Sequence, residues 1–282
     1  MRLGVMQGRL CPQVGDKIQA FPGAGWRNEF ALSRELGLNC IEWVFEEPGF
    51  ESNPIMSDCG IRDMRQVSGD SGVAIGSVVA DYFMVKRLFG EPKPDIERAV
   101  DMLRLLIRNC RAAGIPLVEL PFVDASALKT AQDQAELVKN LERPLEDARK
   151  QGVAVGLETS LAPREFRRLL DTLRPWGVRA NYDMGNSSSL GFHPAEELPV
   201  LGKDIGNVHI KDRVLGGGSV PLGRGDTDFG EVFRQLKALR YDRDFIFQSA
   251  RQDLASSPVK KGPRDTVREC LEFMRPYLES LS

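Results

Sequence analysis

Short, continuously apolar segments recur along the whole chain, and longer amphipathic segments separate them. A segment that is apolar at nearly every position, rather than at alternate positions, is typical of a parallel strand covered on both faces. Strands of this kind alternating with helices predict a single (β/α)8 TIM barrel domain over residues 1–282. Eight segments have this character: Leu3–Gln7, Cys40–Phe45, Val73–Val79, Leu117–Phe122, Val153–Glu158, Val178–Asp183, Asn207–Lys211 and Phe245–Ser249.

Helix signals fill most of the intervals between these strands. Asp95–Ala113 has apolar residues at helical spacing and ends before Gly114, a residue suited to a left-handed C-cap. The alternative fold is an open doubly wound sheet, but the dinucleotide and P-loop glycine motifs that favour it are missing. The other expected helices are Glu29–Leu36, Gln134–Lys150, Arg164–Leu173, Asp228–Leu239 and Thr266–Leu281, and flexible loops are expected at Gly216–Ser219 and Ala255–Pro263.

Charge and composition exclude several classes of protein. Lys plus Arg number 38 and Asp plus Glu 40, so the chain lacks the basic field of a sequence-independent nucleic-acid binder. No apolar run approaches the roughly 20 residues of a membrane helix, and the N-terminal segment does not resemble a signal peptide. The five cysteines form no C-x-x-C pair, which argues against a thiolate zinc site. We therefore expect a cytoplasmic protein with neither nucleic-acid nor membrane partners, and leave association into homo-oligomers open.

Four polar residues stand at or near the ends of the last four predicted strands. They are Glu158, Asp183, His209 and Gln248. In a TIM barrel, chemistry takes place where strands end and the following loops begin, so four successive strands can direct these side chains toward one point. Carboxylates, an imidazole and an amide oxygen suit Mn, Mg, Co or Zn. A divalent metal cation would also compensate the cost of placing carboxylates at the ends of apolar strands.

Each of these residues also has a purely structural interpretation. Glu158 alone can be a salt-bridged carboxylate, and Asp183 alone can cap the turn at Gly185–Asn186. His209 can be a hydrogen-bonded core histidine, and Gln248 has the weakest individual signal. The equivalent positions of the four residues in successive repeats favour a joint metal site. The remaining histidine, His193, is expected on the surface.

Several motifs resemble those of the xylose isomerase-like TIM barrel family, which contains sugar and sugar-phosphate isomerases and epimerases and belongs to one superfamily with endonuclease IV. They are LETS, NYDMGN, NVHIKDR and the segment PLGRGDTDFGEVFRQLKALRYDRDF, together with VMQGRL, IQAFP and IEW near the N-terminus. The resemblance implies a metal held by residues of strands 5 to 8, of which Glu158, Asp183 and His209 match the first three. The endonuclease activity is disfavoured, because its multi-zinc site draws on several histidines and this sequence contains only two, His193 and His209.

The fourth position departs from the family pattern, because Gln248 stands where the family has Glu. An amide oxygen can bind a metal, but it cannot accept a substrate proton. A two-base epimerisation therefore loses its second base, whereas an isomerisation with Glu158 as the single general base stays feasible. Asp81 or Glu119 is a candidate to replace the missing carboxylate.

Candidate substrate-binding residues follow other predicted strands. Arg9, Arg213 and Arg251 suit phosphate or carboxylate groups, although pairing with surface aspartates is the alternative, and Lys211 is a weaker candidate of the same kind. Trp43 and Tyr82 suit stacking on a sugar face, although barrel core is the alternative. Asn186 stands near the position where the family often has a His that holds a substrate hydroxyl.

These residues predict a metal-dependent isomerase or epimerase that acts on a sugar or sugar phosphate through an enediol or enediolate, with Glu158 as general base. Two alternatives stay open. One is a metal-dependent dehydratase of a keto sugar, cyclitol or keto acid, which needs only one base. The other is a non-catalytic sugar-binding barrel, suggested by Gln248.

Overall fold

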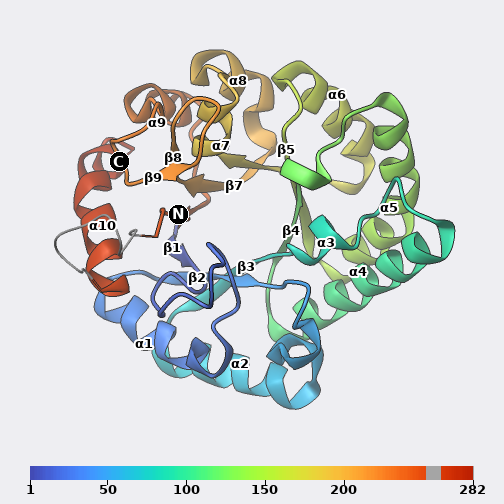
Figure 1. Ribbon diagram of the computed structural model, residues 1–282, viewed down its shortest axis with the longest axis horizontal. Coiled ribbons are helices and arrows are strands. Elements are labelled where there is room, and N and C mark those ends of the chain that lie inside the picture. Colours follow the sequence, from blue (N-terminus) through green and yellow to red (C-terminus); the bar gives the residue numbers. More distant parts are fainter. Residues whose placement is uncertain (252–261, 282) are drawn as a thin grey trace.

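A closed barrel of eight parallel strands forms the centre of the computed structural model, which describes residues 1–251 and 262–281. Each strand pairs with its neighbours in the order β1-β10-β7-β6-β5-β4-β3-β2, and β1 pairs with β10 to close the ring. In Figure 1 the strands form the central ring and the helices surround it. The barrel strands are β1 (Leu3–Met6), β2 (Cys40–Val44), β3 (Ala74–Val79), β4 (Leu117–Phe122), β5 (Ala154–Thr159), β6 (Arg179–Asp183), β7 (Ile205–Ile210) and β10 (Asp244–Phe247).

The predicted fold class is confirmed, and the eight predicted strands match the observed ones to within about two residues at each end. The six predicted helices are also present. Four of the α-helices in the described residues were not predicted, of which α3 and α7 are short and begin within three residues of the ends of β3 and β6. The helices are α1 (Trp26–Glu35), α2 (Asp58–Ser71), α3 (Tyr82–Val85), α4 (Lys93–Ala113), α5 (Ala131–Gln151), α6 (Pro163–Leu173), α7 (Met184–Ser189), α8 (Pro194–Leu201), α9 (Phe229–Ala238) and α10 (Pro263–Glu279).

Local sequence explains where these helices begin and end. Thr130 and Asp133 form a reciprocal capping box at the start of α5. Gly114 takes a left-handed conformation at the end of α4, as the sequence predicts. The long helices are amphipathic, and each packs its apolar face against the outside of the barrel.

The interior of the barrel is divided into an apolar and a polar part. Residues two apart on a strand face the same side, so alternate residues of every strand point inward. Met6, Cys40, Val44, Val79 and Ile246 form a small apolar cluster separate from the main core. The buried polar residues from the barrel strands are Glu42, Ser77, Glu119, Glu158, Asn181, Asp183, Asn207 and His209, most of which lie on β4 to β7.

A two-stranded antiparallel sheet follows β7, formed by β8 (Asp212–Arg213) and β9 (Ser219–Val220). The predicted loop Gly216–Ser219 lies largely between these strands. The other predicted loop, Ala255–Pro263, falls mostly outside the described residues. Asp212 has no exposed surface and accepts hydrogen bonds from the backbone N–H groups of Gly223, Arg224, Gly225 and Thr227 at 2.8–3.1 Å. This carboxylate therefore fixes the loop that leaves β9.

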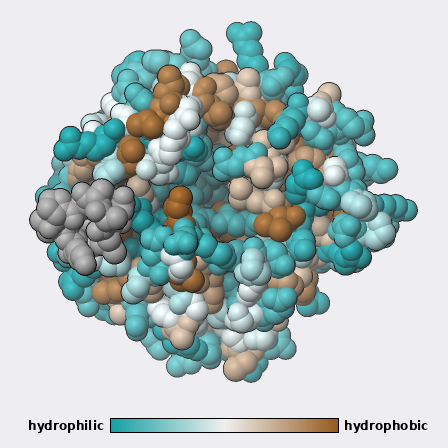
Figure 2. Space-filling model, viewed as in Figure 1, coloured by the Kyte–Doolittle hydropathy of each residue, from teal (hydrophilic) through white to brown (hydrophobic). Residues whose placement is uncertain are grey.

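The outer surface shows no sign of a membrane segment in the described residues, because none of their helices is long and apolar enough to cross a bilayer. Figure 2 shows the face seen in Figure 1, where hydrophilic residues predominate and hydrophobic residues form small, separate groups.

Candidate metal centre

Glu158, Asp183 and His209 meet inside the barrel at the carboxyl ends of β5, β6 and β7. One ligand atom from each lies within 4.8 Å of the others. His209 Nδ1 is 3.6 Å from Glu158 Oε2 and 3.9 Å from Asp183 Oδ2. Asp183 is the direct partner of His209 in the register of β6 and β7, which explains why these side chains are neighbours. All three residues are buried.

A second pair of carboxylates faces the other nitrogen of the same imidazole. His209 Nε2 is 2.8 Å from Glu42 Oε2 and 3.5 Å from Glu119 Oε2. Glu42 Oε1 accepts hydrogen bonds from Ser77 Oγ at 2.7 Å and Asn207 Nδ2 at 3.1 Å. Glu42 was not recognised from the sequence as a site residue, although it lies in the IEW motif. Its position two residues after inward-facing Cys40 is the signal that identifies it.

The contacts of Nε2 with two carboxylates favour Nδ1 as the nitrogen of His209 that binds a cation. A neutral imidazole carries one N–H, and a proton on Nε2 would lie beside the Glu42 carboxylate, whose Oε2 is 2.8 Å away. The lone pair of Nδ1 then faces Glu158 and Asp183, with the Asn181 Nδ2 amide 3.1 Å from it. Carboxylate–imidazole pairs of this kind orient metal-binding histidines in proteins.

Burial and neighbouring charges shift the pKa values of the cluster in different directions. Burial would raise the pKa of Asp183, but the Lys211 ammonium and His209 lower it to about 2. Burial and the charge of Asp183 raise the pKa of Glu158. Burial and the charge of Glu42 raise the pKa of Glu119 well above its ordinary value. Burial would lower the pKa of His209, but the carboxylates around it, with Glu42 first, raise it well above the ordinary value.

Two amides orient the Glu158 carboxylate. Asn186 Nδ2 donates to Oε1 at 2.5 Å, and Asn181 Nδ2 donates to Oε2 at 2.8 Å. Arg213 Nη1 donates to Asn186 Oδ1 at 2.7 Å and so fixes that amide in turn. Asn186 and Arg213 therefore lie at the site, while their predicted contacts with a substrate stay a prediction. Asn181 was not recognised from the sequence.

Asp183 combines its two interpretations. Its Oδ1 accepts a hydrogen bond from Asn186 N at 2.8 Å and caps the start of α7. Its Oδ2 faces His209 Nδ1 and Lys211 Nζ, which are 3.9 and 3.3 Å away. The cap fixes the carboxylate with one oxygen directed into the cluster.

Gln248 follows β10 and lies near the same edge of the barrel. Its Oε1 accepts a hydrogen bond from Lys211 Nζ at 3.2 Å. Its Nε2 donates to Gln19 Oε1 at 3.0 Å. The predicted role of Gln248 as a fourth metal ligand stays a prediction.

Arg9 and Arg251 both hold the loop that follows β1. Arg9 donates to the carbonyl oxygens of Ser249 and Ile18 at 2.9 and 2.8 Å, and it is only 5% exposed. Arg251 donates to the carbonyl oxygens of Gly8, Cys11 and Ile18 at 2.7–3.2 Å. These contacts explain both arginines without a ligand, and their predicted binding of an anionic substrate remains to be tested.

Trp43 and Tyr82 lie among other aromatic residues. Trp43 has no exposed surface, its ring packs on Phe21 and Trp26, and its Nε1 donates to Asn53 Oδ1 at 2.8 Å. Tyr82 is 6% exposed and packs on Phe45, Phe50 and Phe83. Both sets of contacts are those of barrel core, the alternative interpretation of these residues. Stacking on a sugar stays an untested prediction.

The two candidate replacements for the missing carboxylate occupy different places. Glu119 is buried, with its Oε2 3.5 Å from His209 Nε2. Asp81 follows β3, where Gln19 Nε2 donates to its Oδ2 at 2.6 Å. Burial raises the pKa of Asp81 to about 7. Away from the site, His193 is exposed, as predicted, and its Nδ1 accepts a hydrogen bond from Ala195 N at the start of α8.

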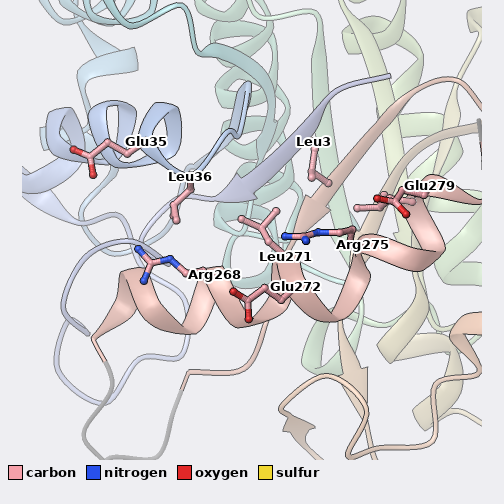
Figure 3. A pocket seen from close by; sticks show the side chains of 9 residues that line it. Leu3, Glu35, Leu36, Arg268, Leu271, Glu272, Arg275 and Glu279 are labelled. Carbon is pink, nitrogen blue, oxygen red and sulfur yellow. The ribbon is translucent and has the colours of Figure 1, made fainter.

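A surface pocket of about 420 Å³ lies between the end of α1 and helix α10. Figure 3 shows its lining side chains, among them Leu36 on one side and Leu271 and Arg275 on the other. Leu3 at the start of β1 contributes to the wall, so this pocket opens at the amino end of the barrel strands. It is therefore separate from the cluster around His209.

The chemistry of the donor set fits a divalent cation. Two carboxylates and an imidazole nitrogen are ligands that Mn, Co and Zn accept in proteins, and Mg accepts the carboxylates. The low pKa of Asp183 keeps that carboxylate ionised. A second buried group that can hold a metal consists of Glu42, Glu119 and the same His209. The described residues thus contain a buried Glu, Asp and His group able to hold a divalent metal.

The fold and the cluster together define a (β/α)8 barrel with a candidate metal centre at the carboxyl ends of its strands. Residues 30–277 match the family described as Xylose isomerase-like TIM barrel, and the chain belongs to that family. Among curated protein sequences, none matches the chain.

Solved structures of sugar epimerases resemble the chain over nearly its full length. A D-psicose 3-epimerase from Clostridium cellulolyticum H10 is 16% identical with a TM-score of 0.78, and 99% of each chain is covered. An L-ribulose 3-epimerase is 18% identical with a TM-score of 0.78, covering 99% of this chain and 95% of that one. A 3-keto-D-glucoside 4-epimerase from E. coli is 16% identical with a TM-score of 0.73, covering 98% of this chain and 99% of the other. At these identities the likeness establishes the fold.

Proposed function

We propose that the protein is a divalent-metal-dependent isomerase or epimerase that acts on a sugar or sugar phosphate through an enediol or enediolate. The observation that carries this proposal is the convergence of Glu158, Asp183 and His209 within 4.8 Å at the carboxyl ends of three successive strands. The similarity of the fold to several sugar epimerases supports the same class of substrate.

In this proposal Glu158, Asp183 and His209 Nδ1 hold the cation. A bound divalent ion polarises the carbonyl group of a ketose and makes the adjacent C–H group more acidic. Glu158 then takes the proton from that carbon and returns it to a neighbouring atom. Its raised pKa makes it a better proton acceptor than Asp183, whose pKa is about 2.

The residues around Glu158 orient the base. Asn181 and Asn186 each donate to one of its oxygens, and Arg213 holds Asn186 in place. A fixed carboxylate loses little freedom when it approaches the reacting carbon, which favours proton transfer.

Gln248 favours one-base chemistry. Its amide cannot accept a proton, so Glu158 is the carboxylate of the predicted four-residue set that is best suited to move one. An aldose–ketose isomerisation by one base therefore agrees better with this site than a two-base epimerisation. Dehydration also needs only one base, which keeps a metal-dependent dehydratase as the second candidate.

Proton exchange tests the proposal directly. The protein would be incubated with Mn²⁺ or Co²⁺ and a panel of ketoses and ketose phosphates in deuterated water. We expect deuterium at the carbon beside the carbonyl of at least one substrate, and exchange at least 100-fold slower with Glu158→Gln. Failure of every substrate to exchange would contradict the proposal. A dehydratase would instead generate a conjugated enone that absorbs in the ultraviolet.

A further inference from the structure

The ammonium group of Lys211 lies inside the candidate metal centre. Lys211 is two residues after His209, so its side chain leaves the barrel wall on the same inner face. Its Nζ is 3.3 Å from Asp183 Oδ2 and 3.2 Å from Gln248 Oε1, and its side chain is only 13% exposed. A positive charge thus already contacts one predicted metal ligand and occupies the amide oxygen of another.

The stem of Lys211 is packed against Gly185 in the first turn of α7. A Cβ atom on residue 185 would lie 2.7 Å from Lys211 Cγ and 2.9 Å from Lys211 Cβ, and two non-bonded carbon atoms do not approach so closely. Only glycine therefore leaves room for the lysine stem at this position. This packing directs the ammonium toward Asp183 rather than toward solvent.

The orientation of the Gln248 amide is set from both sides. An ammonium group only donates hydrogen bonds, so it requires the oxygen of Gln248 rather than the nitrogen. On the other side, Gln248 Nε2 donates to Gln19 Oε1, and Gln19 Nε2 donates to Asp81 Oδ2. A continuous hydrogen-bonded chain thus connects Asp183 through Lys211, Gln248 and Gln19 to Asp81.

We propose that Lys211 and Gln248 together replace an acidic fourth metal ligand: Gln248 holds the ammonium instead of the metal, and the ammonium is a resident cation that weakens metal binding by Glu158, Asp183 and His209. The inference rests on the proposed metal site. A divalent ion beside Asp183 meets the charge of Lys211 at close range, where like charges repel strongly in a partly buried site. Removal of the ammonium therefore strengthens metal binding, whereas removal of the Gln248 amide has little direct effect.

Calorimetric titration of the metal-free protein with Mn²⁺ at one fixed pH tests this arrangement without any substrate. We expect Lys211→Met to bind Mn²⁺ at least tenfold more tightly than the unmodified protein, and Gln248→Met to stay within about threefold of it. The exposed Lys203 supplies the control, because Lys203→Met makes the same change in net charge away from the cluster. Thermal unfolding checks that each variant is folded, and Lys211→Gln serves as a second variant if Lys211→Met is not.

Substitution of Gln248 by Glu in two backgrounds gives an independent result. In the unmodified protein the new carboxylate pairs with Lys211, so Gln248→Glu gains little affinity. In combination with Lys211→Met the same substitution gains at least tenfold over Lys211→Met alone, because the carboxylate is then free to bind the ion.

The other outcomes overturn the inference in distinguishable ways. If Gln248→Met weakens binding tenfold or more, Gln248 is a ligand and the inference is wrong while the metal site stands. If Lys211→Met binds no more tightly than the unmodified protein, the ammonium is not a competitor of the metal. If neither the unmodified protein nor Lys211→Met binds Mn²⁺, the proposed metal site itself fails and this inference fails with it.

Discussion

The contact between Glu42 and His209 gives the structure its sharpest quantitative prediction. Glu42 Oε2 faces His209 Nε2 at 2.8 Å, while Oε1 accepts from Ser77 and Asn207. In Glu42→Gln, one of these oxygens becomes an NH2 group. If the NH2 group faces His209, it can only donate a hydrogen bond, so Nε2 must accept with its lone pair. The proton of the neutral imidazole then lies on Nδ1 and blocks the nitrogen that should bind the metal.

The opposite orientation of the new amide does not restore the site. Its NH2 group would then face Asn207 Nδ2, which is itself a donor, and two buried donors would oppose each other. An unsatisfied buried donor costs about 1–3 kcal/mol, which corresponds to about 5- to 150-fold in an equilibrium constant, and loss of an outer-shell partner of a metal-binding histidine typically costs about 10- to 100-fold in metal affinity. We therefore expect Glu42→Gln to bind Mn²⁺ about 10- to 100-fold more weakly.

Calorimetric titration with Mn²⁺ measures this loss, and circular dichroism verifies that the variant is folded. Ser77→Ala is the matched control, because it removes one contact of Glu42 and leaves the carboxylate facing His209; we expect it to stay within about threefold of the unmodified protein. A folded Glu42→Gln protein with unchanged Mn²⁺ affinity would refute the assignment of Nδ1 as the metal-binding nitrogen.

Three further predictions concern the base, a buried acid and the loop after β1. Glu158→Gln should slow proton exchange at least 100-fold, the range expected for loss of a general base, and a rate within threefold would remove Glu158 from that role. Burial raises the pKa of Glu197 in the folded protein to about 7, above its value in the unfolded chain. The protonated carboxyl therefore contributes fully to the stability of the fold below about pH 4.5, and this contribution is lost as the pH rises through 7. Glu197→Gln should therefore be more stable than the unmodified protein by about 3 kcal/mol or less at pH 8, with the difference vanishing toward pH 4.5 in urea unfolding; a difference independent of pH would contradict the cause. Arg9→Ala leaves the carbonyl oxygens of Ser249 and Ile18 without this donor and should cost about 2–4 kcal/mol of stability, together with faster amide exchange in residues 8–20; unchanged exchange there would show that Arg9 does not hold the loop.

The barrel could be predicted because its strands are buried on both faces. Segments such as Leu117–Phe122 are apolar at nearly every position, and this pattern is strong over few residues. The short helices α3 and α7 could not be predicted in the same way. Each has fewer than two full turns, which is too short to display a helical period, and α7 consists mainly of Gly, Asn and Ser.

The three-residue cluster was predictable from strand ends, whereas the contacts beneath it were not. Glu158, Asp183 and His209 come from consecutive strands, so chain order reflects their proximity. Glu42 reaches His209 from β2, on the far side of the ring, and this contact depends on the closure of the barrel. Only the inward register of β2, with Cys40 and Glu42 on one face, carries a sequence signal for it.

The fate of the surrounding cations also required coordinates. Arg9, Arg213 and Arg251 follow strands as anion-binding residues do, but each donates to protein oxygens in the structure. Lys211, the weakest of the cationic candidates in the sequence, is the one that contacts Asp183. The difference arises because an arginine whose guanidinium donates to protein oxygens leaves no signal in the sequence that distinguishes it from a ligand-binding arginine.

The account depends most directly on the position of the metal. A crystal soaked in Mn²⁺, with the ion located by its anomalous scattering, tests that position. The account predicts one peak bound by Glu158, Asp183 and His209 Nδ1, with the ammonium of Lys211 displaced from Asp183 and Gln248 outside the coordination sphere. A peak on the Nε2 side of His209 between Glu42 and Glu119, or no peak near His209 at saturating Mn²⁺, would contradict it.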